Sequence, residues 1–321
     1  MPIPSLFQGK LSLPVIASPM FIVSYPDLVL AQCKAGIVGT FPSLNARQPE
    51  LLDEWLGRIT AELAGFGADH PGAAVAPFGV NLIVHRSNSR LQGDVELMVK
   101  HKVPLIITSV GAPVGIVEAV HSYGGLVFHD VTNIRHARKA LEAGVDGLIL
   151  VAAGAGGHAG TTSPFALLAE VRAFFDGPIV LAGAISTGTE IRAAEVLGAD
   201  FAYIGTRFIA TAEGNAPPEY KQMLIDHAAA DIVYTPMFSG IPGNYLAPSV
   251  AAAGLDPAAI TGGKADPNLT IEDWSKKKAW KDIWSAGQGI GSIHDAPTVA
   301  DLVDRMKAEY RAAAARPAPF A

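Results

Sequence analysis

The sequence predicts an α/β protein, a (β/α)8 or TIM barrel with a cap segment inserted in its C-terminal third. Short apolar or β-branched runs alternate with segments of helical periodicity, which is typical of repeated βα units and a parallel sheet. The length of 321 residues suits one such barrel with an added segment. A weak internal repeat supports this prediction. The same order of a helix, a short Gly-containing turn and a strand occurs twice, with Ala143–Asp146 as the first turn and Leu197–Asp200 as the second.

Each strand is predicted from one apolar run. The runs are residues 15–17, 37–39, 78–81, 105–109, 126–129, 147–151, 179–182 and 201–204. The helices between them have readable ends: Ser24 should cap a helix over 26–35, Thr132 a helix over 134–143, and Ser163 with Pro164 should open a helix that runs to 174. Glycines such as Gly144 can adopt the left-handed conformation that turns the chain back toward the sheet.

The alternation of strands and helices stops between Thr211 and Ser285, where proline, glycine and asparagine become frequent. We therefore predict a barrel over residues 1–210 and 286–321, with 211–285 as an inserted cap or lid. Helical periodicity returns over 296–314, which we expect to pack on the barrel as its last helix, and the tail around Arg316–Pro319 is expected to fray.

Composition narrows the class of partner. A net charge of −6 and a pI near 5.8 argue against nucleic acid or an anionic membrane as the main partner. The short run Lys276–Lys278 is flanked by acids and is predicted to be a solvated face. No apolar run reaches the ~18 to 20 residues of a membrane helix, and no signal peptide is evident. The single cysteine, Cys33, excludes an internal disulfide and a cysteine-based metal site; no metal is expected, and a reducing cytoplasm fits best.

The segment Gly154–Gly160 carries the clearest chemical signal. Its glycines follow an apolar strand and can let the main chain approach a flat ligand, while His158 can take or return a proton near neutral pH. A turn whose histidine only caps backbone groups is the simpler interpretation. A dinucleotide fingerprint fits poorly, because the following strand ends in Gly183 and Ala184 without the expected acid.

Other polar or glycine positions also fall at the ends of predicted strands. They are Ser18–Met20, Asn81, Ser109, His129, Gly183–Ala184 and Gly205–Thr206. In a TIM barrel these ends lie on one rim, where the active site is built, and the loops after the last two strands commonly hold a phosphate. Arg207 is the one cation in those two loops, so backbone amides would supply most of the binding. The alternative is that these glycines only make tight turns.

Several ordered motifs resemble those of the nitronate monooxygenase family, formerly called 2-nitropropane dioxygenases. They are Ile16–Met20 with Val23–Pro26, Gly79–Leu82, Ala155–Gly160, Leu181–Ile185 and Ile204–Phe208. The late segment Trp284–Gln288 also resembles the Ala-Gly-Gln element of the family. Flavin-dependent enoyl reductases and NADH:quinone reductases share much of this pattern, so the motifs specify FMN better than they specify substrate.

The resemblance implies a non-covalent FMN, with His158 as the catalytic residue over the reactive face of the ring. The implied cofactor-binding residues are Ser18, Pro19 and Met20 against the ring, Asn81 hydrogen-bonded to it, the loop glycines Gly156 and Gly157, and Gly183, Ala184, Gly205 and Thr206 around the phosphate. Two departures concern Val151 and Gly154, which stand where the family usually has polar or acidic residues, and Asp130, which lies where some relatives have a lysine.

The function implied is an FMN-dependent monooxygenase that converts an alkyl nitronate, with O2, into a carbonyl compound and nitrite. His158 would hydrogen-bond the nitro oxygens or act as a base toward a neutral nitroalkane. An NAD(P)H-dependent reductase of quinones or enoyl thioesters is the alternative, and a non-catalytic FMN-binding module is a second. Tyr234, Phe238 and Tyr245 either wall the substrate side or only pack. The oligomeric state is left open, a homo-oligomer included.

Overall fold

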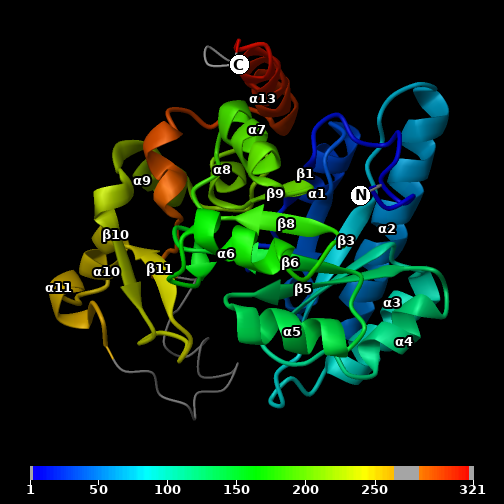
Figure 1. Ribbon diagram of the computed structural model, residues 1–321, viewed down its shortest axis with the longest axis horizontal. Coiled ribbons are helices and arrows are strands. Elements are labelled where there is room, and N and C mark those ends of the chain that lie inside the picture. Colours follow the sequence, from blue (N-terminus) through cyan, green and yellow to red (C-terminus); the bar gives the residue numbers. More distant parts are fainter. Residues whose placement is uncertain (1–2, 264–281, 318–321) are drawn as a thin grey trace.

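Eight parallel strands form the barrel, one near each predicted run (Figure 1). The computed structural model describes residues 3–263 and 282–317. In sheet order the strands are β1 (Val15–Ala17), β9 (Phe201–Ile204), β8 (Ile179–Ala182), β6 (Gly147–Val151), β5 (Leu126–Val131), β4 (Leu105–Ser109), β3 (Phe78–Ile83) and β2 (Gly39–Pro42). A parallel bridge between Ile16 and Val38 brings the two ends of the sheet together. The predicted (β/α)8 fold is therefore confirmed.

Alternation of side chains along the strands separates the two sides of the sheet. In β4, Leu105 and Ile107 belong to the cluster that fills the barrel interior, whereas Ile106 packs outward against the helices. Phe7 precedes β1 and closes this interior cluster, with its ring 5.0 Å from that of Phe201 in an edge contact. This end of the barrel interior is therefore filled by apolar side chains, and the polar residues predicted for the site lie at the other end.

Helices cover the outside of the barrel. They are α1 (Pro26–Lys34), α2 (Pro49–Asp69), α3 (Leu91–His101), α4 (Ile116–His121), α5 (Ile134–Glu142), α6 (Pro164–Arg172), α7 (Gly188–Leu197) and the short α8 (Thr206–Ile209), with a 3-10 turn η1 (Ser43–Asn45) after β2. The last helix, α13 (Val299–Ala314), packs on α7 and α1, as expected for the predicted terminal helix.

Three local predictions were wrong in detail. The second strand is shifted by two residues, because Ile37 and Val38 are buried but only Val38 pairs, through the bridge that closes the sheet. Ser24 does not cap α1; its hydroxyl accepts a hydrogen bond from the Met20 amide instead. The N-cap of α5 is Asn133 rather than Thr132, since the Asn133 side chain accepts from the His136 amide.

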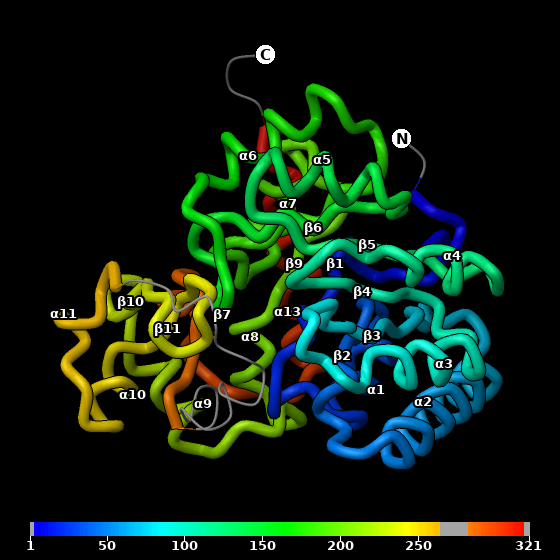
Figure 2. Tube along the Cα trace, turned by 90° about the horizontal axis from the view of Figure 1, so that it is seen from below, coloured from blue at the N-terminus to red at the C-terminus, as the bar shows by residue number. Residues whose placement is uncertain are grey.

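The segment 211–285 has its own small sheet (Figure 2). Its elements are α9 (Pro218–Asp226), η2 (Ala229–Asp231), β10 (Ile232–Thr235), β11 (Gly243–Leu246), α10 (Ala247–Ala252) and α11 (Pro257–Ile260). β10 and β11 are antiparallel, and β11 pairs in turn with β7 (Gly157–His158) from the loop after β6. The η3 turn (Gln288–Ser292) then leads to α13. Lys276–Lys278 and the end of the tail lie outside the described residues.

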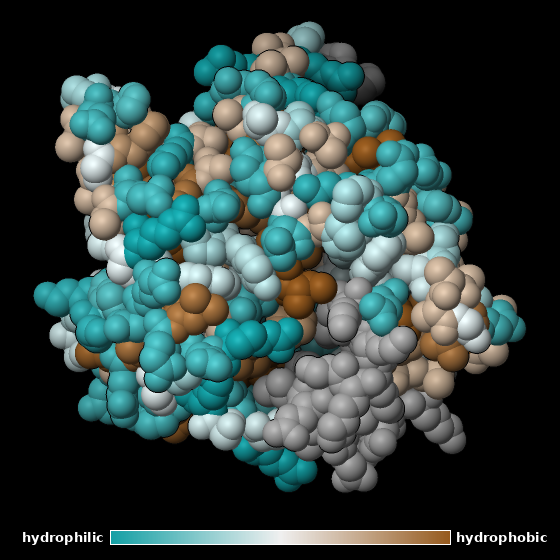
Figure 3. Space-filling model, turned by 180° about the vertical axis from the view of Figure 1, so that it is seen from behind, coloured by the Kyte–Doolittle hydropathy of each residue, from teal (hydrophilic) through white to brown (hydrophobic). Residues whose placement is uncertain are grey.

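The surface is mixed in polarity. On the face shown in Figure 3, hydrophobic side chains lie in small groups among hydrophilic ones. The most exposed large apolar side chains among the described residues include Val114, Val196 and Phe165, with 80%, 71% and 68% of their surface exposed. Within residues 3–263 and 282–317, no helix is both long and apolar enough to cross a bilayer.

Candidate active site

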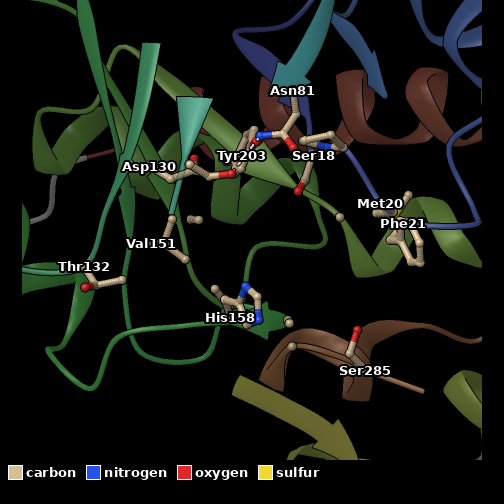
Figure 4. A pocket seen from close by; sticks show the side chains of 18 of the residues that line it. Ser18, Met20, Phe21, Asn81, Asp130, Thr132, Val151, His158, Tyr203 and Ser285 are labelled. Atoms are coloured by element: carbon tan, nitrogen blue, oxygen red, sulfur yellow. Dashed lines mark hydrogen bonds between the residues drawn. The ribbon is translucent and has the colours of Figure 1, made fainter. Parts of the chain in front are cut away.

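A cavity of about 680 Å³ opens at the C-terminal ends of the strands. This volume is in the range of small-molecule and cofactor sites. The residues predicted for the site all line it: Ser18, Pro19, Met20, Asn81, Gly156, Gly157, His158, Gly183, Ala184, Gly205 and Thr206. The barrel topology thus brings together positions in or after five strands that are far apart in the sequence (Figure 4). Asn81 lies inside β3 rather than at its end, because this strand continues two residues beyond the predicted one, to Ile83.

The turn Ser18–Met20 is held by backbone and side-chain hydrogen bonds on both sides. The Ser18 amide donates to the Ile204 carbonyl at 2.8 Å, which ties the end of β1 to the end of β9. Asn45 donates from Nδ2 to the Met20 carbonyl at 3.0 Å, and its Oδ1 accepts from the Ile22 amide at 2.8 Å. The turn is therefore rigid, and it presents Pro19 and Met20 as an apolar wall of the cavity.

Asn81 has one defined orientation at the end of the barrel interior. Its Nδ2 donates to the Ile107 carbonyl at 3.2 Å and to Ser109 Oγ at 3.1 Å. These two bonds use both N–H groups of the amide, so any further bond must be accepted by Oδ1. The site consequently offers a ligand an acceptor at this position.

The glycines on the rim of the cavity differ in how strictly the surrounding structure excludes a side chain at each position. A Cβ on Gly183, where φ is +137°, would lie 2.7 Å from the Ala153 carbonyl oxygen, and a Cβ on Gly156 would lie 2.8 Å from the Gly287 amide nitrogen. Close packing of the loops therefore excludes side chains there. A Cβ on Gly205 would meet Ser18 Cβ at 3.3 Å, which a small shift can relieve.

Arg207 does not contribute its charge to the cavity. Its guanidinium is buried and donates to the Asp295 carboxylate at 2.7 Å and to the Ala210 carbonyl at 3.0 Å. The side chain thus links α8 to the segment before α13. An anion bound at the two loops after β8 and β9 would therefore have to be held by main-chain amides and by the beginning of α8, as expected from the sequence.

His158 is fixed by both its backbone and its side chain. It is part of β7, where it pairs with Gly243 of β11. Its Nε2 lies 2.8 Å from Ser239 Oγ, and its imidazole points into the cavity in Figure 4. Burial lowers the pKa of His158 to about 4, so the ring is neutral at neutral pH and able to accept a proton.

Asp130 and Tyr203 occupy the barrel side of the cavity, beside Ser18 and across from His158 (Figure 4). Burial raises the pKa of Asp130 to about 7. The pKa of Tyr203 is raised well above its usual value by burial and, to a smaller extent, by the nearby Asp130 carboxylate. Asp130 lies within β5, which is two residues longer than predicted, and Val151 adds an apolar contact to the cavity wall.

The three aromatic residues predicted either to wall the substrate side or to pack do not line the cavity. Phe238 and Tyr245 are buried in one small cluster with ring centroids 4.8 Å apart, and Tyr234 donates its hydroxyl to the Ala159 carbonyl at 2.8 Å. None of the three is among the cavity-lining residues of the described chain. Tyr220, Ile241 and Ser285 line the cavity from this segment instead.

Comparisons with known proteins agree with this architecture. The family model for nitronate monooxygenase matches residues 76–309. The chain is similar to a nitronate monooxygenase of Paraburkholderia phytofirmans, with 26% identity over 93% of this chain and 92% of that protein. It is also similar to (3aS,4S,5R,7aS)-5-hydroxy-7a-methyl-1-oxo-octahydro-1H-indene-4-carboxyl-CoA dehydrogenase of Rhodococcus jostii, with 25% identity over 92% of each chain.

A solved structure shows the same fold. The nitroalkane oxidase of Streptomyces ansochromogenes superimposes with a TM-score of 0.79 at 24% identity, covering 97% of this chain and 99% of that one. The family match covers well over half of the sequence and includes His158 and both rim loops. This chain therefore belongs to the nitronate monooxygenase family of flavoenzymes and is an oxidoreductase of that type.

Proposed function

We propose that this protein is an FMN-dependent nitronate monooxygenase that oxidises alkyl nitronates with O2 to carbonyl compounds and nitrite. The observation that carries the proposal is the position of His158, a neutral imidazole in a cavity that is also lined by the glycine loops at the ends of β8 and β9. Family membership and the similarity to a nitronate monooxygenase at 26% identity support the same activity.

The residues present fit FMN. The rim at Gly183, Ala184, Gly205 and Thr206 exposes backbone beside the beginning of α8, as a phosphate without a cationic partner would require. Ala184 holds a left-handed conformation, with φ of +55°, and its amide donates to the Gly154 carbonyl at 3.3 Å, which fixes this loop against the loop after β6. The walls at Pro19, Met20 and Val151 are apolar, as a flat ring would need.

When bound, FMN would supply the electron transfer between the substrate and O2. The chain would position the substrate between the cofactor and His158 and exclude water from the reacting atoms. His158 would hydrogen-bond a nitro group or remove the α-proton of a neutral nitroalkane. Gly156 and Gly157 would allow the main chain to approach the ring closely, and Asn81 Oδ1 would accept a hydrogen bond from it.

A reductase that oxidises NAD(P)H and reduces a quinone or an enoyl thioester is the second candidate. Its specific support is the Rhodococcus jostii relative, whose name describes a dehydrogenase of an acyl-CoA. That relative is as similar to this chain as the nitronate monooxygenase is, and it matches over the same share of the sequence.

Anaerobic reduction distinguishes these candidates. Purified flavin-loaded protein is mixed separately with a propyl nitronate and with NADH or NADPH, and the flavin absorbance is followed. Bleaching by the nitronate, followed by nitrite formation after O2 is admitted, is the result expected. Bleaching by a nicotinamide alone would replace the proposal with a reductase, and no bleaching by either would indicate a binding module.

A further inference from the structure

At the cavity end of the barrel interior, β5 and β9 carry polar side chains above an apolar layer. Phe128 and Phe201 lie in the apolar interior cluster, and the next side chains on the same face of each strand are Asp130 and Tyr203. Both line the cavity, close to Ser18 in the view of Figure 4. The side of the cavity formed by these two strands is therefore polar, although it rests on an apolar core.

The carboxyl of Asp130 makes no hydrogen bond or ion pair with the residues that the structure describes. Its Oδ1 is completely buried, whereas the residue as a whole is half-buried and lines the cavity, so Oδ2 is the oxygen open to a ligand. A buried polar group without a partner is costly, and native sites usually complete it with a water or a ligand. The orphaned carboxyl therefore points to a ligand that contacts this side of the cavity.

The surroundings of Asp130 favour the neutral carboxyl. In the described part of the chain, the other titratable residues that line the cavity are His129, His136, Lys139, His158, Tyr203 and Tyr220. Burial lowers the pKa of His129 and of His158 to about 4 and raises the pKa of both phenols, so none of these four is charged at neutral pH. His136 and Lys139 are exposed on α5, and burial alone accounts for the raised pKa of Asp130, about 7.

A neutral carboxyl differs from an ionised one in what it offers a ligand. It carries one O–H donor, whereas the carboxylate only accepts. Asn81 is the opposite case, because both of its N–H groups are used within the barrel and only Oδ1 is left to accept. The cavity thus presents a donor on β5 and an acceptor on β3. The pyrimidine part of a flavin ring, which carries two carbonyl oxygens and one N–H group, can pair with both.

We propose that Asp130 binds FMN as a neutral carboxylic acid, whose O–H group donates a hydrogen bond to an acceptor atom of the flavin ring. This inference deepens the proposed function and rests on it for the identity of the cofactor. In the flavin-free protein the carboxyl exchanges its proton with solvent near neutral pH. At higher pH, FMN binding then requires one proton to leave the solvent and bond to Asp130, because a carboxylate would repel a ring oxygen.

The uptake of this proton can be measured by calorimetry. Flavin-free protein is titrated with FMN at pH 8 in two buffers that differ in enthalpy of ionisation, and the difference in heat gives the number of protons bound. With a pKa of about 7 before binding, wild type should take up about 0.9 proton, and Asp130→Asn about none. Asp176→Asn removes an exposed carboxyl outside the cavity and should behave as wild type. Equal uptake by wild type and Asp130→Asn, or none in wild type, would overturn the proposal.

The affinity for FMN should depend on the same proton. Between pH 7 and 9, above the phosphate pKa of ~6, the Kd of wild type should rise about tenfold per pH unit. Asp130→Asn keeps an N–H donor, so its Kd should be similar to that of wild type at pH 7 and should not change with pH. Asp130→Leu has no donor and should bind weakly throughout. A wild-type affinity that increases with pH would show a carboxylate that accepts a hydrogen bond, contrary to the proposal.

Infrared spectroscopy tests the flavin-loaded wild type without relying on a variant. At pH 8 its spectrum should contain the C=O stretch of one protonated carboxyl, and this band should be absent from Asp130→Asn. Carboxylate bands alone would overturn the proposal.

These measurements separate the inference from the proposed function. FMN that binds without proton uptake would reject the role of Asp130 and leave the FMN-dependent enzyme intact. Proton uptake on FMN binding, in a protein whose flavin is not bleached by a nitronate, would reject the monooxygenase and leave the role of Asp130 intact. Folded protein that binds no FMN at any pH would reject both.

Discussion

The Asp130 carboxyl and the Tyr203 phenol interact electrostatically at the cavity, although their strands β5 and β9 are not neighbours in the sheet. Both side chains face the cavity, and Asp130 Oδ1 has no hydrogen-bond partner within the described part of the chain. A carboxyl in such surroundings is more easily kept protonated than ionised, which is why its pKa rises to about 7. An acid with this pKa can donate a hydrogen bond to a ligand below neutral pH.

Asp130→Asn in the flavin-free protein tests this property. The folded-state pKa is raised from 3.8, so ionisation favours the unfolded chain progressively as the pH rises from about 4 to about 7. The stability of Asp130→Asn relative to wild type should increase through that window by up to about 1.4 kcal/mol per pH unit, and then level off. Urea unfolding at pH 4.5, 6 and 7.5 measures it, and a pH-independent difference would contradict the raised pKa.

His158→Asn should keep the fold and the flavin but lose turnover of neutral nitroalkanes. Removal of one general base costs roughly 10²- to 10⁴-fold, and the preformed nitronate should be affected less. In wild type the rate with a neutral substrate should fall only as the pH approaches the His158 pKa of about 4, because the ring is neutral above it. His121→Asn, on an exposed helix end, is the matched control. Near-wild-type rates on both substrate forms would return His158 to a structural role.

Gly205→Asp should weaken FMN binding. The added carboxylate would enter the rim after β9, where amides would meet the phosphate, and repel it. The backbone of Gly205 has φ of −109°, which any residue can adopt, so Gly205→Ala should fold and bind nearly as wild type does. Fluorescence titration of both flavin-free variants with FMN measures the effect. Equal affinities in two folded variants would place the phosphate elsewhere.

Asp295→Asn should destabilise the fold without changing the cavity. It leaves the buried Arg207 guanidinium without its carboxylate, which should cost about 1 to 3 kcal/mol. Asp304→Asn is the control, because Asp304 pairs with Lys307 on the surface, where such a pair contributes ~0 to 1 kcal/mol. Urea midpoints measure both variants, and similar shifts in the two would show that the Arg207 pair is not needed.

The repeated βα pattern was predictable because local signals agree with the fold. Gly144 and Gly198, each predicted to turn the chain after a helix, do so with φ of +86° and +109°. Most of the rim residues were predictable because they directly follow strands, and parallel strands place such positions at one end of a barrel. A short strand such as β2 is less certain from sequence, since Ile37 and Val38 look like strand residues and only the closure of the sheet decides which residues pair.

Contacts between distant segments were not predictable. Ser239 has no sequence signal that relates it to His158, because the contact depends on how the 211–285 segment folds back onto β7. Tyr203 lies within an apolar strand, and alternation indicates that it faces inward but not that it lies near enough to Asp130 for the two to interact electrostatically. The role of the 211–285 segment as a lid, like the roles assigned to the site residues, stays a prediction.

The pairing of β7 with β11 means that the histidine loop is one edge of the sheet formed by the later segment. Removing that segment to make a minimal barrel would also remove the ladder that orients the main chain at Gly157 and His158. The barrel alone is thus an incomplete scaffold for catalysis: transplanting the His158 loop into another barrel would require transplanting β10 and β11 with it.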